Sequence, residues 1–192
     1  MDQVRLLRKH VEEINEALAM AMKDFVPALC RLSKIPGVDL YAAQELLAEI
    51  GPRAAAFPSA EQFASWVGVC PGSQESAGVN YSRRSPKGNR YLRRLFMQTA
   101  WGAIHTKDTF FAGLFQRLKP KIKAKGAAWA VAHRMAKVIW LILHEEVEYQ
   151  EKGPAIPNQR TLTRRLRNLV REFQRQGIDV KAIFNQTLEA HA

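Results

Sequence analysis

The chain has 192 residues, is 47% hydrophobic, and carries 29 lysines and arginines against 18 aspartates and glutamates. That apolar content can build a folded core, which excludes disorder as the main state, and the longest unbroken apolar run, residues 138–143, is too short to span a membrane. The N-terminus lacks a signal-peptide pattern and two cysteines make no disulfide framework or zinc site by themselves, so we expect a cytoplasmic protein with a polyanionic partner.

The N-terminal segment carries apolar residues alternately three and four positions apart. They are Val4, Leu7, Val11, Ile14, Leu18, Ala21 and Phe25. This heptad pattern predicts a helix with a narrow apolar seam, which favours a partner helix from the same chain or from a second copy. An ordinary surface helix is the alternative. We predict a coiled-coil helix over residues 1–30, the C-terminal part of a longer one, through which the chain forms a homo-oligomer.

Two helices are predicted on either side of Pro36-Gly37, the second over residues 40–50. The order helix, Pro-Gly-hydrophobic, helix is typical of a helix-hairpin-helix, whose backbone N–H groups bind phosphate without reading the base sequence. Gly37 is therefore a candidate nucleic-acid contact. Asp39 replaces a usual second glycine, and its carboxylate would repel a phosphate, so a structural helix pair capped by Asp39 is the alternative.

Glycines and prolines punctuate residues 68–90, which predicts a long loop or a β-hairpin. The loop is rich in serine and arginine. A hydroxyl in it could act as a nucleophile if a base, a positive charge or a metal activates it. The alternative is a basic loop that binds DNA without chemistry.

The remaining elements are helical. A helix is predicted from Asn89, a strongly apolar one over residues 127–148 at the centre of the core, and a basic amphipathic one over residues 161–176 after a Gly-Pro linker. We therefore predict a mainly α protein with a helix-hairpin-helix. Its predicted parts are the coiled-coil helix, a domain over residues 31–153 that contains the serine loop, and a linker with a basic helix over residues 154–192.

The positive charge is clustered in three blocks. Residues 73–94 contain six cations against one carboxylate, residues 117–125 contain five cations, and residues 160–175 contain six arginines against one glutamate. Clustered cations that meet phosphates release counterions, which makes the affinity depend steeply on salt. Three solvated surfaces are the alternative to nucleic-acid binding.

Four stretches follow one another in an order and spacing known from a transposase family. They read IPGVDLYAAQELLAEIG, FPSAEQFASWVGVCPGSQESAG, SPKGNRYLRR and AWGAIHTKDTFFAGLFQRL. Through them the chain resembles the C-terminal domain of the insertion sequence one-ten/one-sixteen/nine-zero-two family of RNA-guided DEDD transposases, over about residues 29–153. The resemblance implies a DNA-binding enzyme of DNA transposition, a mobile-element recombinase, with guide RNA as a further partner.

The resemblance also implies a nucleophile. A serine in this domain of the family attacks a DNA phosphodiester and forms a covalent protein–DNA intermediate, and the matching residue here is Ser76, in the stretch Glu-Ser-Ala-Gly. Tyr81 is an alternative nucleophile that the resemblance does not select. The alternative is that Ser76 only supports a turn.

The following motif supplies the expected phosphate contacts, with Gly88 and Asn89 as turn and helix cap. Together with the basic loop and the hairpin, the predicted nucleic-acid-binding residues are Lys87, Arg90, Arg93, Arg83, Arg84, Gly37 and Gly78. His133 and His144 are expected to have a core or surface role and not to bind metal.

The acidic DEDD set of the family finds no match in this sequence. We therefore expect no cofactor in this chain and a divalent metal, magnesium, in a missing N-terminal domain, without which the chain binds DNA but does not recombine it. A non-catalytic helix-hairpin-helix module, a truncated transposase remnant and an oligomerisation factor remain the alternatives.

Overall fold

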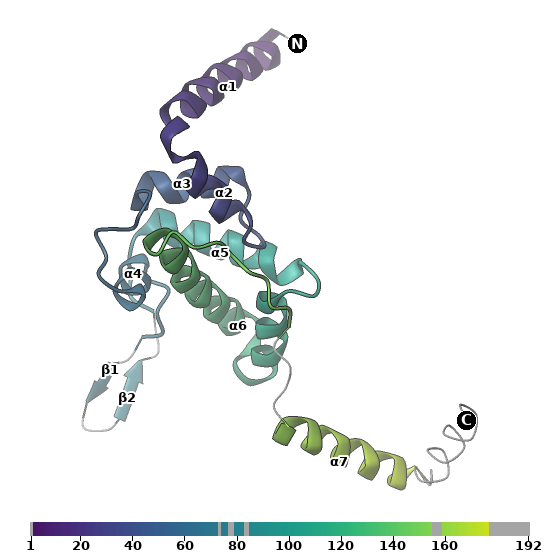
Figure 1. The fold of residues 1–192 in the computed structure, drawn as a ribbon. Helices are drawn as coiled ribbons and strands as arrows, with labels where there is room; N and C mark the ends of the chain where they lie inside the picture. Colours follow the sequence, from purple (N-terminus) through teal and green to yellow (C-terminus); the bar gives the residue numbers. More distant parts are fainter. Residues whose placement is uncertain (1, 73, 77–78, 83–84, 155–158, 177–192) are drawn as a thin grey trace. The chain divides into compact units, whose positions relative to one another are not determined.

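The computed structural model describes residues 2–72, 74–76, 79–82, 85–154 and 159–176 (Figure 1). They fall into two compact units, Met1–Pro154 and Ala155–Ala192. Helices dominate the described residues, so the predicted mainly α class is confirmed.

The chain begins with α1 (Asp2–Ala21), a single 3-10 turn η1 (Lys23–Phe25), and α2 (Val26–Ser33). Pro27 lies in the first turn of α2, where a missing N–H leaves no helical hydrogen bond unmade. No residue of α1 is buried, and Leu7 and Ile14 in its apolar seam are 63% and 65% exposed. The first unit therefore leaves this seam uncovered.

The second helix of the predicted pair, α3, spans Leu40–Ile50. The carboxylate of Asp39 accepts a hydrogen bond of 2.8 Å from the backbone N–H of Ala42, so Asp39 is the helix cap. The helix ends at Gly51, whose backbone has a φ of +80°. The two helices pack on each other, and Leu32, Ala43 and Leu46 between them are at most 1% exposed.

α4 (Ala60–Val67) begins at Ser59, whose hydroxyl accepts a 3.2 Å hydrogen bond from the N–H of Gln62. Two short antiparallel strands follow, β1 (Gln74–Ser76) and β2 (Val79–Ser82). The long basic segment thus contains a hairpin, one of the two forms expected from its glycines.

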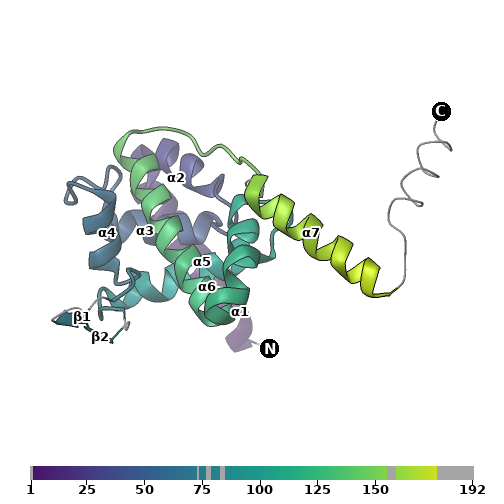
Figure 2. The same cartoon turned by 90° about the horizontal axis from the view of Figure 1, so that it is seen from below.

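α5 (Arg90–His105) and α6 (Phe110–His144) lie side by side and form the centre of the first unit (Figures 1 and 2). The expected helix over residues 127–148 is the second half of α6 and ends at His144. α6 also begins earlier than expected. Pro120 and the run of basic residues interrupt the helical pattern in its first half, so the sequence pattern does not indicate a helix there. The backbone of Lys123, with φ 63° and ψ 168°, separates the halves.

The second half of α6 is the most buried element, and its Val131, Met135 and Ile139 have no exposed surface. Among the described helices, α6 is long and apolar enough to cross a membrane by length and composition, but 50% of its most apolar window is buried inside the protein. A helix at the centre of a core has the same composition, and the packing of these residues accounts for it.

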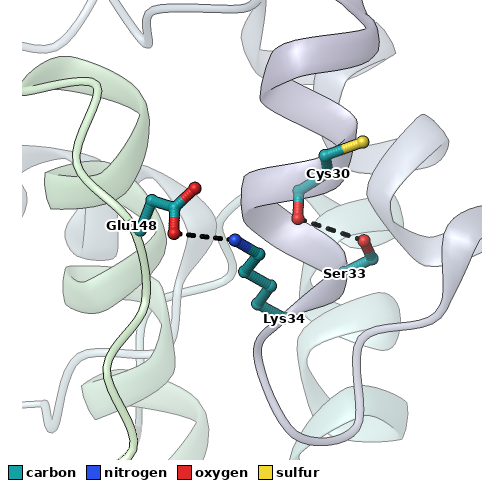
Figure 3. Close-up of polar contacts among 4 residues, drawn as sticks. All are labelled: Cys30, Ser33, Lys34 and Glu148. Atoms are coloured by element: carbon teal, nitrogen blue, oxygen red, sulfur yellow. Dashed lines mark hydrogen bonds and ion pairs between the residues drawn. The ribbon is translucent and has the colours of Figure 1, made fainter.

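The segment after α6 returns across the helices. Lys34, just after α2, forms a 2.7 Å ion pair with Glu148, and this hydrogen bond lowers the pKa of the glutamate (Figure 3). Further along, the carboxylate of Glu151 accepts a 2.8 Å hydrogen bond from the N–H of Phe110 at the start of α6. These contacts tie the end of the first unit to the end of α2 and to the start of α6.

The second unit contains α7 (Gln159–Arg175). Its apolar Leu166, Leu169 and Phe173 are 65%, 50% and 39% exposed. This is the basic amphipathic helix that the sequence predicts over residues 161–176.

Candidate nucleic-acid interface

The two ends of the hairpin segment are pinned together by glycines. Gly68, which ends α4, lies against the backbone of Gly88, and a Cβ on either glycine would overlap the other. The N–H of Asn89 donates a 3.0 Å hydrogen bond to the carbonyl of Trp66, and the hydroxyl of Ser85 donates to the carbonyl of Gly68. The chain that enters the hairpin and the chain that leaves it are therefore held at one place, beside the start of α5.

The first turn of α5 is capped by Asn89, whose side-chain oxygen accepts hydrogen bonds from the N–H groups of Tyr91 and Leu92 at 2.9 and 3.1 Å. Acidic residues favour this end of a helix, but α5 has none in its first turn and carries Arg90 and Arg93 there instead. Cations at a helix N-terminus oppose the helix dipole. The placement of Arg90 and Arg93 therefore does not stabilise α5. An anionic partner would offset their unfavourable interaction with the helix dipole.

Arg93 connects the loop to both central helices. Its Nη1 donates to the carbonyl of Lys87 at 3.1 Å and also to the carbonyl of Pro86. Its guanidinium lies 4.6 Å from the ring centroid of Trp129 on α6, a cation–π contact. Arg93 thus fixes the segment that carries Lys87. The other N–H donors of its guanidinium can serve a phosphate.

Two adjoining hollows open beside Arg93. The first, about 650 Å³, is lined by Ser85, Lys87, Arg90, Arg93, Arg94, Met97 and Trp129. The second, about 720 Å³, is lined by Val69, Cys70, Pro71, Ser85, Arg93, Lys121, Ile122, Lys123, Gly126, Trp129, Ala130 and His133. Ser85, Arg93 and Trp129 line both, so we treat the two hollows as one surface and call it the basic groove.

The charge of the basic groove has one sign. Six described cations line it, and no carboxylate appears among its described lining residues. Two of the charge blocks seen in the sequence, residues 73–94 and residues 117–125, contribute to it, although more than twenty residues separate them. Such a surface attracts phosphate groups and repels cations.

Two titratable groups besides the lysines and arginines, Cys70 and His133, line the second hollow. Burial, followed by the nearby Lys137, lowers the pKa of His133, and burial raises the pKa of the Cys70 thiol. Nδ1 of His133 is buried without a hydrogen-bond partner among the described residues. Lys137 itself pairs with Glu61 of α4, and its hydrogen bond lowers the pKa of that carboxyl. The charge of the groove therefore comes from its lysines and arginines.

The structure brings together three of the predicted contacts, Lys87, Arg90 and Arg93. Ser76 is the last residue of β1 and pairs with Val79 across the hairpin.

Other predicted residues lie elsewhere. Gly78, Arg83 and Arg84 are outside the described residues. Gly37 lies against α5, where a Cβ would overlap the backbone of Thr99 and Ala103, so the structure gives this glycine a packing role. A nucleic-acid contact at Gly37 stays a prediction.

Sequence reasoning did not select Lys121, Lys123 and His133 as site residues. The run of alternating lysines was visible, but only the fold shows which of them reach the groove.

Within the described part of the chain, no group of three or more His, Cys, Asp or Glu side chains could hold a metal ion. These residues therefore do not fit the divalent metal that the resembled family implies.

The segment that supplies one side of the groove matches a known family, whereas the lining residues from Lys121 onward lie beyond the match. Residues 30–114, which run from α2 through the hairpin and α5 into α6, match the family described as Transposase IS116/IS110/IS902 family. The resemblance found in the sequence motifs is thereby confirmed.

Transposase relatives extend the likeness beyond this segment. The chain is 29% identical over 130 residues to the putative transposase y4pF/y4sB of Sinorhizobium fredii, covering 63% of this chain and 32% of that protein. It is 27% identical over 128 residues to the probable family 20 transposase of Pseudomonas aeruginosa, covering 62% and 36%. It is 26% identical over 142 residues to the insertion element IS110 uncharacterized 43.6 kDa protein of Streptomyces coelicolor, covering 73% and 35%. The match thus spans about a third of the length of each relative.

Proposed function

We propose that this chain is the DNA-binding, serine-bearing part of a transposase, which takes part in strand cleavage and transfer during DNA transposition. The observation that carries the proposal is the basic groove, built in part from the segment that matches the transposase family. Guide RNA is a second proposed partner, since its backbone presents the same phosphates to the groove.

The groove supports binding to the backbone of a nucleic acid and not to its base edges. Its described charges are lysines and arginines, which neutralise phosphates without reading sequence. Arg93 is held rigidly by carbonyls and by the face of Trp129, so little side-chain freedom is lost when it meets a phosphate.

We further propose Ser76 as the nucleophile. Its Oγ would attack the phosphorus of a DNA phosphodiester, so that an O–P bond to serine forms and the bond from phosphorus to the departing sugar oxygen breaks. A base takes the serine proton, and the departing oxygen takes a proton. The hydroxyl of another strand can reverse the step, because the phosphodiester energy is conserved in the covalent intermediate.

Two features support this assignment. Ser76 stands at the end of β1, in a hairpin whose two ends are pinned next to the groove by Gly68 and Gly88. The arginines of the groove would stabilise negative charge on the phosphoryl group in the transition state. We propose that a divalent metal and its acidic ligands come from a resolvase-like partner domain, so this chain alone binds DNA without recombining it.

Replacement of Ser76 by alanine tests the nucleophile. With a DEDD resolvase-like domain supplied, the parent chain should form a covalent protein–DNA adduct that survives denaturation and should exchange strands. Ser76→Ala should lose both, by about 10³-fold or more, while its DNA affinity stays within about twofold, because only the attacking oxygen is removed.

Tyr81→Phe is the matched control, since Tyr81 lies on the paired strand β2. An adduct that persists in Ser76→Ala and disappears in Tyr81→Phe would assign the reaction to the tyrosine. If the parent chain binds DNA but forms no adduct with the partner domain, the chain is a non-catalytic DNA-binding module.

We also propose that α1 joins two copies of this chain. The first two heptads of the seam have valine at the first position, Val4 and Val11, and Leu7 or Ile14 at the fourth, and β-branched residues at the first position favour two-stranded coiled coils. Leu7, Val11 and Ile14 are each more than half exposed in the isolated chain, so a second copy of α1 would bury surface that nothing described covers.

A further inference from the structure

The backbone of α6 breaks at a lysine. With φ 63° and ψ 168°, Lys123 adopts a conformation that is essentially confined to glycine, because a Cβ there crowds the neighbouring backbone. Pro120 explains a lost hydrogen bond one turn earlier, but it does not explain a positive φ three residues later. A glycine, Gly126, stands three positions on and would accept such a conformation without strain.

The break changes which lysines share a surface. In an uninterrupted α-helix, residues two positions apart point in directions about 200° apart, so Lys121 and Lys123 would lie on opposite faces. In this structure both line the second hollow of the basic groove, which Arg93 also lines. Lys119 and Lys125, from the same basic run, do not line it.

The strained residue is therefore a charged one, placed in a cation-lined groove. Placing two further cations in the hollow that Arg93 lines costs free energy in the absence of a partner, since like charges repel and the backbone is strained. Binding of a polyanion would offset both the charge repulsion and the backbone strain. Strained backbone that is retained beside convergent charge is typical of ligand-binding sites.

We propose that Lys121 and Lys123 form a second phosphate-binding position, which extends the contact of a nucleic-acid backbone from Lys87 and Arg93 onto α6. This inference rests on the proposed function, because it assigns further contacts to the same partner. The ligand class is the phosphodiester backbone, without preference for base sequence.

The substitution Lys123→Gly separates charge from structure. Glycine adopts the observed φ and ψ without strain, so the variant should keep the fold, with a melting temperature equal to that of the parent or a few degrees higher. Lys121→Gln removes the neighbouring charge at a helical position. Lys125→Gln is the control, because it removes one charge from the same run outside the groove.

The measurement is the Kd of the full chain for a 30-base-pair DNA duplex of arbitrary sequence, by fluorescence anisotropy over a range of salt concentrations. Lys123→Gly and Lys121→Gln should each weaken binding by about three- to tenfold and reduce the salt slope by about one. Lys125→Gln should change Kd by less than about twofold, because exposed charges farther from the ligand are screened.

The inference is wrong if Lys121→Gln and Lys123→Gly bind the duplex as tightly as Lys125→Gln does. If Lys87→Gln still binds the duplex more weakly than the parent, the proposed function stands. A parent chain that does not bind the duplex at low salt overturns the proposed function itself. If Lys123→Gly does not fold, Lys121→Gln decides between these outcomes.

Discussion

Gly37 and Gly51 flank α3 and share a left-handed backbone, with φ of +82° and +80°, but their surroundings differ. A Cβ on Gly37 would overlap the backbone of α5, whereas a Cβ on Gly51 would meet nothing within 4 Å. Gly37 is therefore needed for both its conformation and its close approach. Asp39 caps the helix α3 that follows Gly37. The local geometry therefore favours a structural helix pair at this turn over a phosphate-binding hairpin.

Alanine at the two positions should separate these causes. Gly51→Ala should lower the free energy of unfolding by about 1–2 kcal/mol, the cost of a positive φ alone. Gly37→Ala should lower it by about 3–4 kcal/mol, because α5 must also move. Urea unfolding at constant m-value measures both. Equal losses in the two variants would contradict the packing role of Gly37.

At the scale of elements, α1 and α6 are unusual in opposite ways. α1 has an apolar seam that the first unit does not bury, while the second half of α6 is buried almost throughout. Most of the stability of a helix in a protein comes from packing of its apolar face, so the partner that we propose would stabilise α1. The heptad spacing makes a second α1 the partner we propose.

Charge placed in the seam should separate the copies. We expect the parent chain to sediment as a dimer at micromolar concentration, and Val11→Asp/Ile14→Asp to weaken association by at least about 100-fold, because aspartates cannot be buried in an apolar seam. The core should stay folded, since both side chains are mostly exposed in the single chain. Analytical ultracentrifugation and circular dichroism measure the two effects.

Ala19→Asp, which adds one charge at an exposed position outside the seam, is the control and should remain a dimer. A parent chain that sediments as a monomer would remove α1 as a dimerisation helix.

At the scale of the first unit, two of the three charge blocks converge. Residues 85–94 reach the basic groove from the hairpin and α5, and residues 121–123 reach it from α6. The contact between α5 and α6 creates this convergence, with Arg93 and Trp129 at the junction. Part of the net charge of +11 is thus gathered on one surface, whose described lining residues include no carboxylate.

The salt dependence of DNA binding should report the size of this surface. If the six described cations of the groove each neutralise one phosphate, the logarithm of the association constant should fall with the logarithm of salt concentration with a slope of about −5. Titration of a duplex between 50 and 300 mM potassium chloride, about the range over which such affinities fall measurably, gives the slope. An affinity that does not change with salt would contradict binding through the groove.

The sequence by itself determined the mainly α class, the cap residues Asp39 and Asn89, and the resemblance to the transposase family, because caps and motifs depend on residues close together in the chain. It also indicated Lys87, Arg90 and Arg93 as neighbours. Only the tertiary structure decided that Gly37 packs on α5, that α6 breaks at Lys123, and that two charge blocks share one groove. These features depend on contacts between segments that are distant in the sequence. A local pattern of residues does not specify which distant segment packs against it.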